Sequence, residues 1–411
     1  MNKILWPLVI GLLMLSLNLV WMGFSHHYGI FQSYLHNQAA FAFELVGNHW
    51  RHPEPWLHDW FFNQDAPYKY RLLGKVPVYL CYKALGMVLH PLPALYYAYL
   101  LWCWLFLALV LRLGTDLCWE ILKHCVPGVE DREPVVRRLA LLVLVLCPPL
   151  LFAFKFPTHG SPNDLLGYAL IALACLSLIR EQYRQFVFWM LLAVPCRETN
   201  LIMLLPFVML RKPDWRFRFG MAALVLAANL AYRWLWPGHY NPFTAAGHNL
   251  QYPLESLFYL FLVFAPLWLL GLLGYGKLRR QDIENDAVNA LVRSFLPATV
   301  AVLVISFSLA RVREIRIEFI LFFYVIPFSL AYLLQRWRIW LATARSWKMV
   351  PILILTVLLA LRLWLYFLGG FGGDWQGVFM AYFVVTLLVV GVSVAAQWGS
   401  EVVNDDWIQS E

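Results

Sequence analysis

Long apolar runs separated by short polar segments follow one another along the whole chain. An α-helix needs about 20 mostly apolar residues to cross a hydrocarbon layer of about 30 Å. A helix also satisfies its own backbone hydrogen bonds, which lipid cannot do. The pattern therefore predicts an all-α, polytopic membrane bundle that forms a single domain over residues 1–411. The ten predicted spans are 4–24, 94–113, 139–154, 165–179, 219–236, 256–275, 294–310, 319–334, 349–368 and 378–396.

Two further apolar segments do not fit this pattern. Segment 76–90 is short, because a helix of that length measures only about 22 Å at 1.5 Å per residue. Segment 187–210 has Arg197 and Glu198 at its centre, and charge at mid-membrane depth is costly. We therefore expect 187–210 to be a broken hairpin whose polar tip opens into a cavity from the outer side. In an alternative topology, 72–90 spans the membrane and 187–210 crosses it once.

The longest stretch without a predicted span is 25–93, between the first two spans. A loop of this length is usually functional or disordered, and its many aromatic residues, among them Trp50, Trp56 and Trp60, argue against disorder. We expect it to form a cap of surface helices on the outer face of the membrane.

Composition supports the membrane assignment. Hydrophobic residues make up 61% of the chain and charged residues 14%, against about a quarter charged in soluble proteins. The net charge of +8 is explained by basic cytoplasmic loops, which orient membrane helices, so no nucleic-acid partner is expected. The same rule predicts cytoplasmic N- and C-termini, as in a protein of the bacterial inner (plasma) membrane. The seven cysteines form no CxxC pair, which favours buried thiols over disulfides or a zinc site.

Some cations fall on the predicted outer face, where they oppose the orientation rule. An anionic ligand would explain them, because the planar guanidinium of Arg binds two phosphate oxygens at once. For the cluster Arg311, Arg313 and Arg316, an intrahelical network with Glu314 and Glu318 is the alternative explanation. The groups are Lys69, Arg71 and Lys75; Lys155 with His159; Arg197; and Arg311, Arg313 and Arg316.

Carboxylates on the same face supply the second part of a candidate site. Transfer of a sugar from a phosphate to a hydroxyl needs a base for the hydroxyl proton and cations or a metal for the departing phosphate. Asp59, Asp65 and Asp164 are the candidate catalytic acids, although Asp164 could instead cap the helix that follows it. No metal site is predicted, because the early histidines have no neighbouring carboxylates.

The order of these parts resembles the GT-C class of membrane glycosyltransferases. The resemblance rests on loose motifs in the cap, in the short turn ending at Asp164, in 195–200 (PCRETN) and in 311–318 (RVREIRIE). The cap residues that carry it are Tyr34, Ala39, Ala40, Gly47, Trp50 and the segment 69–83. It implies a polyprenyl-phosphate-linked sugar as donor, contact with membrane lipids and a divalent metal as a candidate cofactor.

One departure from the class concerns its early acidic residue, which is replaced here by Gln32 and Ser33. The base would then be Asp65 or Asp59. The predicted function is transfer of a sugar from a polyprenyl-phosphate or pyrophosphate carrier to an outer-face acceptor. A glycan polymerase or ligase, a secondary transporter or lipid flippase, and a noncatalytic subunit of an envelope complex remain alternatives. The predicted substrate-binding residues are Arg71, His159, Arg197, Glu198, Arg311, Arg313 and Arg316.

Overall fold

The computed structural model describes residues 4–22, 73–151, 162–235, 242–309, 318–344, 346, 349–367 and 376–403. Helices make up 88% of these residues, and no strand occurs among them, so the predicted all-α class is confirmed. The helices are α1 (Leu5–Met22), α5 (Lys75–Leu85), α6 (Pro91–Cys125), η2 (Glu130–Arg132), α7 (Glu133–Leu146), α8 (Pro148–Leu151), α9 (Pro162–Ile179), α10 (Tyr183–Ala193), η3 (Glu198–Met203), α11 (Leu204–Val208), α12 (Trp215–Leu235), α13 (Pro242–Gln251), α14 (Pro253–Phe264), α15 (Pro266–Leu278), α16 (Asp286–Leu309), η4 (Glu318–Leu321), α17 (Phe322–Ala344), α18 (Met349–Phe367) and α19 (Gln376–Val403).

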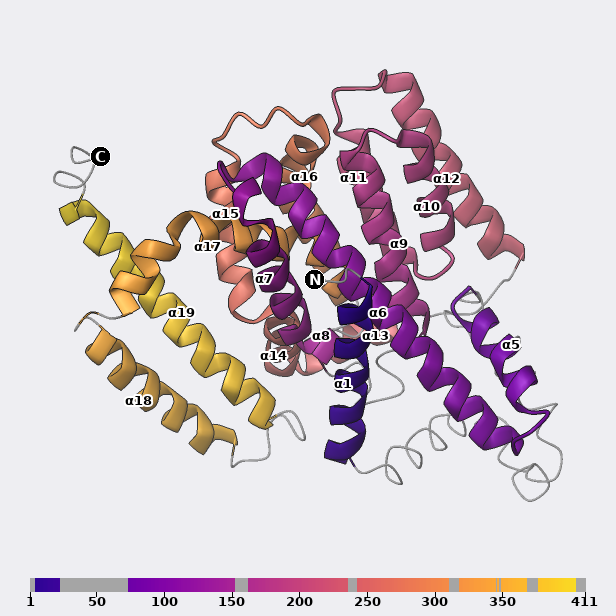
Figure 1. The fold of residues 1–411 in the computed structure, drawn as a ribbon, viewed down its shortest axis with the longest axis horizontal. Helices are drawn as coiled ribbons and strands as arrows, with labels where there is room; N and C mark the ends of the chain where they lie inside the picture. Colours follow the sequence, from indigo (N-terminus) through magenta and orange to yellow (C-terminus); the bar gives the residue numbers. More distant parts are fainter. Residues whose placement is uncertain are drawn as a thin grey trace.

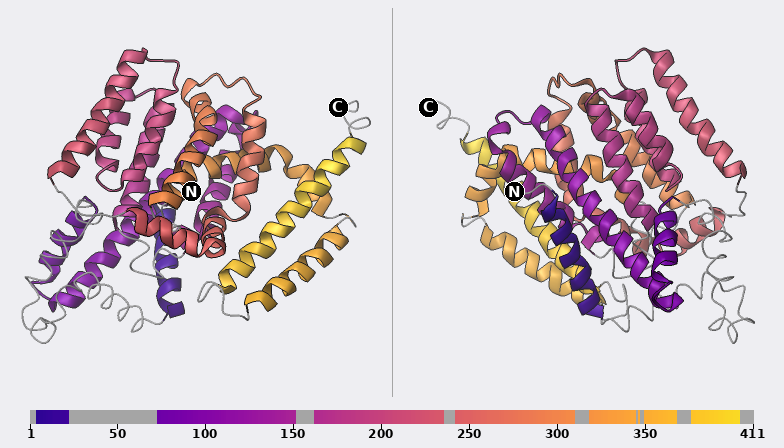
Figure 2. Two further views of the ribbon diagram at one scale, coloured as in Figure 1. Left: turned by 180° about the vertical axis from the view of Figure 1, so that it is seen from behind. Right: turned by 45° about the vertical axis from the view of Figure 1, so that its right-hand side comes forward.

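Helices α9 and α17 form the centre of the bundle, because they are the most completely buried of the long apolar helices. Helix α9 packs against α6 and α10, and α17 packs against α15, α6 and α19. Helices α18 and α19 lie side by side at one edge of the bundle (Figure 1), and α18 packs mainly on α19. The two further views show the same separation of this pair from α10 and α12 (Figure 2).

Five helices in the described residues are long and apolar enough to cross a membrane, or six if α14 and α15 count as one bent span. These helices mark the chain as a membrane protein, but the predicted number of about ten spans is not confirmed. Three further apolar helices are shorter, and the predicted span 139–154 is divided at Cys147 into α7 and α8.

Helix α6 is longer than predicted. It has 35 residues, about 52 Å at 1.5 Å per residue, and it includes positions 114–125, which the sequence analysis assigned to a loop. The charged residues that suggested a loop are paired on the helix. Asp116 accepts from Arg112 at 3.0 Å and also from Arg137 of α7, and Glu120 pairs with Lys123 at 2.5 Å.

The predicted continuous span 256–275 is also corrected. Helices α14 and α15 meet at an angle of 66°, and the residue between them, Ala265, has a φ of 45°. Pro266 begins α15, and a proline has no N–H with which to continue the preceding helix. The hydrophobic pattern runs through the bend without change, so hydropathy alone could not predict it.

Segment 187–210 leaves the end of α9 and returns to it. The chain turns into α10 after Ile179, whose carbonyl accepts from Asn285 at 3.1 Å. It comes back at Arg211 and Lys212, whose backbone N–H groups donate to the Asp286 carboxylate at 2.7 and 2.9 Å. Asp286 directly follows Asn285, so the two ends of the hairpin meet at the same place. The rings of Phe186 on α10 and Phe207 on α11 stack at 4.6 Å. The two limbs are therefore antiparallel, which differs from the alternative topology with a single crossing.

The bundle has two chemically different ends, which we name after residues at the two ends of α9. At the Arg180 end, Arg180 pairs with Glu120 of α6 at 3.4 Å, and Gln335 of α17 donates to the carbonyl of Cys125 at 3.3 Å. At the Asp164 end, Asn18 near the end of α1 donates to the carbonyl of Leu151 of α8 at 2.9 Å. The loops predicted to be basic and cytoplasmic thus meet at the Arg180 end.

Candidate functional site

A buried ion pair joins the first turn of α9 to the tip of the broken hairpin. The Arg197 guanidinium donates to the Asp164 carboxylate at 2.5 Å, and each side chain is only 2% exposed. Asp164 is the third residue of α9, which begins at Pro162, so it does not cap the helix. Arg197 is in extended conformation immediately before η3. The break in the hairpin therefore brings the arginine to α9.

Close packing around Gly167 supports this contact one turn beyond Asp164. A side chain at Gly167 would come within 3.1 Å of the Asn200 amide and 3.4 Å of the Cys196 side chain. Asn200 is itself fully buried and donates to the Ala193 carbonyl at 2.6 Å. This bond bridges the break between α10 and η3, so the tip that carries Arg197 has a defined shape.

A second, more open ion pair holds the other side of the tip. Glu198, next to Arg197, pairs at 3.4 Å with Arg233 near the end of α12. The Arg233 side chain is 43% exposed. Sequence reasoning missed Arg233, although its place near the end of the predicted span 219–236 marked it as a further cation at this end.

The part of the predicted cap that the structure describes is fixed beside Asp164. The Gly74 N–H donates to Asn163 Oδ1 at 2.7 Å, and a Cβ at Gly74 would be 2.6 Å from the Asn163 backbone nitrogen. Only glycine allows this approach, which places the buried Lys75 at the start of α5 near the ion pair. Sequence analysis treated Lys75 as an outer cation but did not predict the contact through Gly74.

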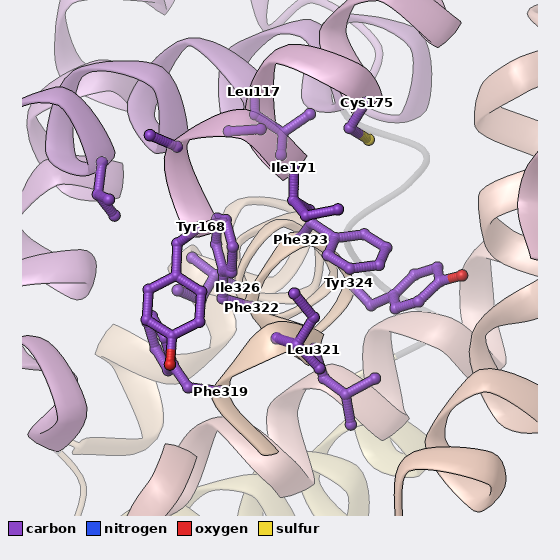
Figure 3. Close-up of a cluster of buried hydrophobic side chains, with 14 of the residues drawn as sticks. Leu117, Tyr168, Ile171, Cys175, Phe319, Leu321, Phe322, Phe323, Tyr324 and Ile326 are labelled. Carbon is purple, nitrogen blue, oxygen red and sulfur yellow. The ribbon is translucent and has the colours of Figure 1, made fainter. Parts of the chain in front are cut away.

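An aromatic cluster lies along α9 from the ion pair. Tyr168 is four residues after Asp164, and its ring meets Phe319 edge-on at 5.1 Å, while Phe319 stacks on Phe322 at 5.4 Å (Figure 3). Glu318, directly before Phe319, is fully buried at the start of η4. In the sequence, Glu318 is considered only within an intrahelical network with Arg311 and Glu314, which lie outside the described residues, so that network stays a prediction.

The ion pair and Arg180 lie at opposite ends of α9. From Asp164 to Arg180 the rise is about 24 Å at 1.5 Å per residue, slightly less than a hydrocarbon layer of about 30 Å. At the other end of α9, Arg180 pairs with Glu120 of α6. The ion pair therefore lies about 24 Å along α9 from the Arg180 end.

Comparisons with protein-family models, with curated proteins and with solved structures found no match to this chain.

Three of the predicted site residues thus lie together, namely Asp164, Arg197 and Glu198. Seven others fall outside the residues that the structure describes, so their predicted roles stay predictions. Within the described ranges, no group of three His, Cys, Asp or Glu side chains could hold a metal ion. The seven are Asp59, Asp65, Arg71, His159, Arg311, Arg313 and Arg316.

Proposed function

We propose that the protein is a membrane glycosyltransferase that moves a sugar from a polyprenyl-phosphate or pyrophosphate carrier to an acceptor on the outer face of a bacterial inner membrane. The observation that carries the proposal is the buried pair of Arg197 and Asp164 in the first turn of α9, a helix long and apolar enough to cross a membrane. Ionisable groups within membrane helices are rare and usually functional. A carrier phosphate would sit at this depth, because its polyprenyl chain must remain in the lipid.

In this proposal Arg197 binds the carrier phosphate and Asp164 positions Arg197. A guanidinium has five N–H donors in a fixed plane, so it can donate to Asp164 and still donate to phosphate oxygens. The Asp164 carboxylate is occupied by the guanidinium at 2.5 Å, so it acts on Arg197 and not on the acceptor hydroxyl. Glu198 and Arg233 form the more exposed side of the same tip, where the sugar and acceptor would bind.

The apolar face of α5 suits the polyprenyl part of the carrier. Helix α5 begins beside Asn163, and Val76 and Leu80, one turn apart, are 48% and 62% exposed. The opposite face, with Val78 and Tyr82, is buried against the bundle. A lipid chain lying on α5 would therefore place its phosphate near the start of α9.

The reaction would break the bond between the anomeric carbon of the sugar and the phosphate oxygen, and the electron pair would stay with the phosphate. The acceptor hydroxyl oxygen would bond to the anomeric carbon, and its proton would pass to a carboxylate. Asp65 or Asp59 of the predicted cap is proposed as that base. Arg197 would stabilise the negative charge that grows on the leaving phosphate.

The test is turnover of polyprenyl phosphates that carry radiolabelled sugars, with purified protein in lipid nanodiscs. We expect Arg197→Gln to lower turnover at least a hundred-fold, and Asp164→Asn to lower it less, because the first removes a transition-state contact and the second only its support. The matched control is Arg138→Gln, which removes an exposed cation at the Arg180 end. Wild-type turnover in both site variants would overturn the proposal.

A secondary transporter or lipid flippase is the second candidate, and one observation favours it. Transporters of this kind use paired broken helices near the substrate, and the chain has two breaks, at 194–197 in the hairpin and at Ala265 between α14 and α15. Movement of a fluorescent carrier lipid across proteoliposomes, without any glycosylated product, would support this function over the transferase.

A further inference from the structure

A cavity of about 290 Å³ opens at the Arg180 end of the bundle, between α15 and α17. Three cations line it: Lys277 in the last turn of α15, Arg280 in the turn that follows α15, and Arg336 of α17. Lys277 and Arg280 lie in one turn at the end of α15, where the Arg280 N–H donates to the Lys277 carbonyl at 3.1 Å. This cavity is far from the ion pair, because α17 begins at Phe322, whose ring lies 6.1 Å from that of Tyr168, and reaches the end of α6 at Gln335.

Close packing of α15 and α17 brings the three cations together. A Cβ at Gly274 would be 2.0 Å from the Phe328 carbonyl oxygen, and one at Gly271 would be 3.2 Å from that of Val325. Ser329 of α17 also donates to the Leu267 carbonyl of α15 at 3.0 Å. The cations are thus held near one another by contacts that do not involve their own charges.

None of the three cations forms an ion pair with a residue that the structure describes. The contact recorded for Lys277 is with the ring of Tyr332, 5.5 Å from the ammonium nitrogen. Cations at a helix C-terminus offset the helix dipole, which accounts for Lys277 and Arg280. It does not account for Arg336, which lies well inside α17.

The rest of the lining is apolar. Leu272 and Leu273 lie about one turn before Lys277 on α15, and the Leu272 side chain is 45% exposed. A ligand that fills the cavity would therefore meet positive charge at one end and hydrocarbon at the other. A free phosphate matches only the first of these features, whereas an anionic phospholipid matches both.

We propose that this cavity binds the phosphate headgroup of an anionic phospholipid from the leaflet at the Arg180 end, with an acyl chain against Leu272 and Leu273. Arg280 and Arg336 donate to the phosphate oxygens, and the Lys277 ammonium lies behind them over Tyr332. Basic clusters between membrane helices attract anionic lipids by about 1 kcal/mol per Lys or Arg near the surface. The site is independent of the transferase proposal and of its residues.

The test compares two double variants with the same loss of charge. Arg280→Gln with Arg336→Gln removes two cations that line the cavity. Arg279→Gln with Arg338→Gln removes two exposed cations that do not line it, one directly after α15 and one on α17. Each protein is purified in mild detergent, incubated with phosphatidylglycerol or phosphatidylcholine, and analysed by native mass spectrometry. Size-exclusion profiles identify any variant that does not fold.

We expect the wild-type protein and the control variant to retain phosphatidylglycerol at least ten-fold more than phosphatidylcholine, and the cavity variant to lose this preference. Equal retention by all three proteins, or equal loss in both double variants, would overturn the site and leave only a general orientation role for the cations. A separate arm adds millimolar inorganic phosphate. Complete displacement of the lipid by phosphate would overturn the lipid assignment in favour of a soluble phosphate ligand.

Discussion

The Arg197 guanidinium donates to the carboxylate of Asp164, 33 residues earlier in the chain, at 2.5 Å in a fully buried contact. This contact holds the tip of a broken hairpin against the first turn of α9. It also creates the only place in the described residues where a predicted catalytic acid meets a predicted phosphate ligand. The same bond therefore has consequences for stability and for function.

Breaking the pair from one side should destabilise the fold strongly. Asp164→Asn or Arg197→Met leaves a buried charge without its partner, and such changes cost about 3–5 kcal/mol. The double variant Asp164→Asn with Arg197→Met removes both charges, so we expect it to be less destabilised than the sum of the two single variants. Denaturant titration of each protein in detergent measures the free energies of unfolding of the two single variants and the double variant. Simple additivity would show that the pair does not stabilise the hairpin.

Gly74→Ala should weaken the link between α5 and α9. The added Cβ would lie 2.6 Å from the Asn163 nitrogen and 2.7 Å from its Cα, and backbone atoms cannot move away easily. We expect a loss of about 1–3 kcal/mol, typical of overpacking, and faster proteolysis near α5. The control is Gly220→Ala in α12, where the added Cβ meets nothing within 4 Å. A Gly74→Ala protein as stable as this control would contradict the contact.

Two glycines of α15, two residues apart, allow a matched test of its contact with α17. Gly274→Ala places a Cβ 2.0 Å from the Phe328 carbonyl oxygen, whereas Gly276→Ala meets nothing within 4 Å. We expect Gly274→Ala to lower the midpoint of thermal unfolding, and Gly276→Ala to leave it unchanged or raise it, since alanine favours helix by about 1 kcal/mol. Equal midpoints would mean that the two helices are farther apart.

Labelling of introduced cysteines should show that the hairpin begins and ends on one side of the membrane. Arg184→Cys and Arg216→Cys flank the hairpin at exposed positions, and we expect an impermeant maleimide to reach both from the same side. Lys83→Cys on α5 should be labelled from the opposite side. Background is low because six of the seven native cysteines are buried, and Cys81→Ser removes the other. Labelling of positions 184 and 216 from opposite sides would contradict the hairpin.

The position of most helices could be predicted from sequence because a membrane imposes a local requirement. A span needs about 20 apolar residues in a row, and a charged, proline-containing interruption such as 195–198 is visible in the chain itself. The break in the hairpin and the gathering of basic loops follow from such local features. The predicted span 94–113 is shorter than α6 because the charged residues after it indicate a loop. In the structure these residues remain on the helix, where Asp116 pairs with Arg112 and Glu120 pairs with Lys123.

Tertiary structure alone decided which groups meet. Sequence analysis named Asp164 and Arg197 as members of one site, but their direct pairing depends on the return of the hairpin to α9 and on the space left by Gly167. The bend at Ala265 and the contact of Gly74 with Asn163 were equally invisible in the hydrophobic pattern. Hydropathy reports whether each segment prefers lipid, whereas ion pairs and close helix contacts depend on distances between segments, which only the folded bundle defines.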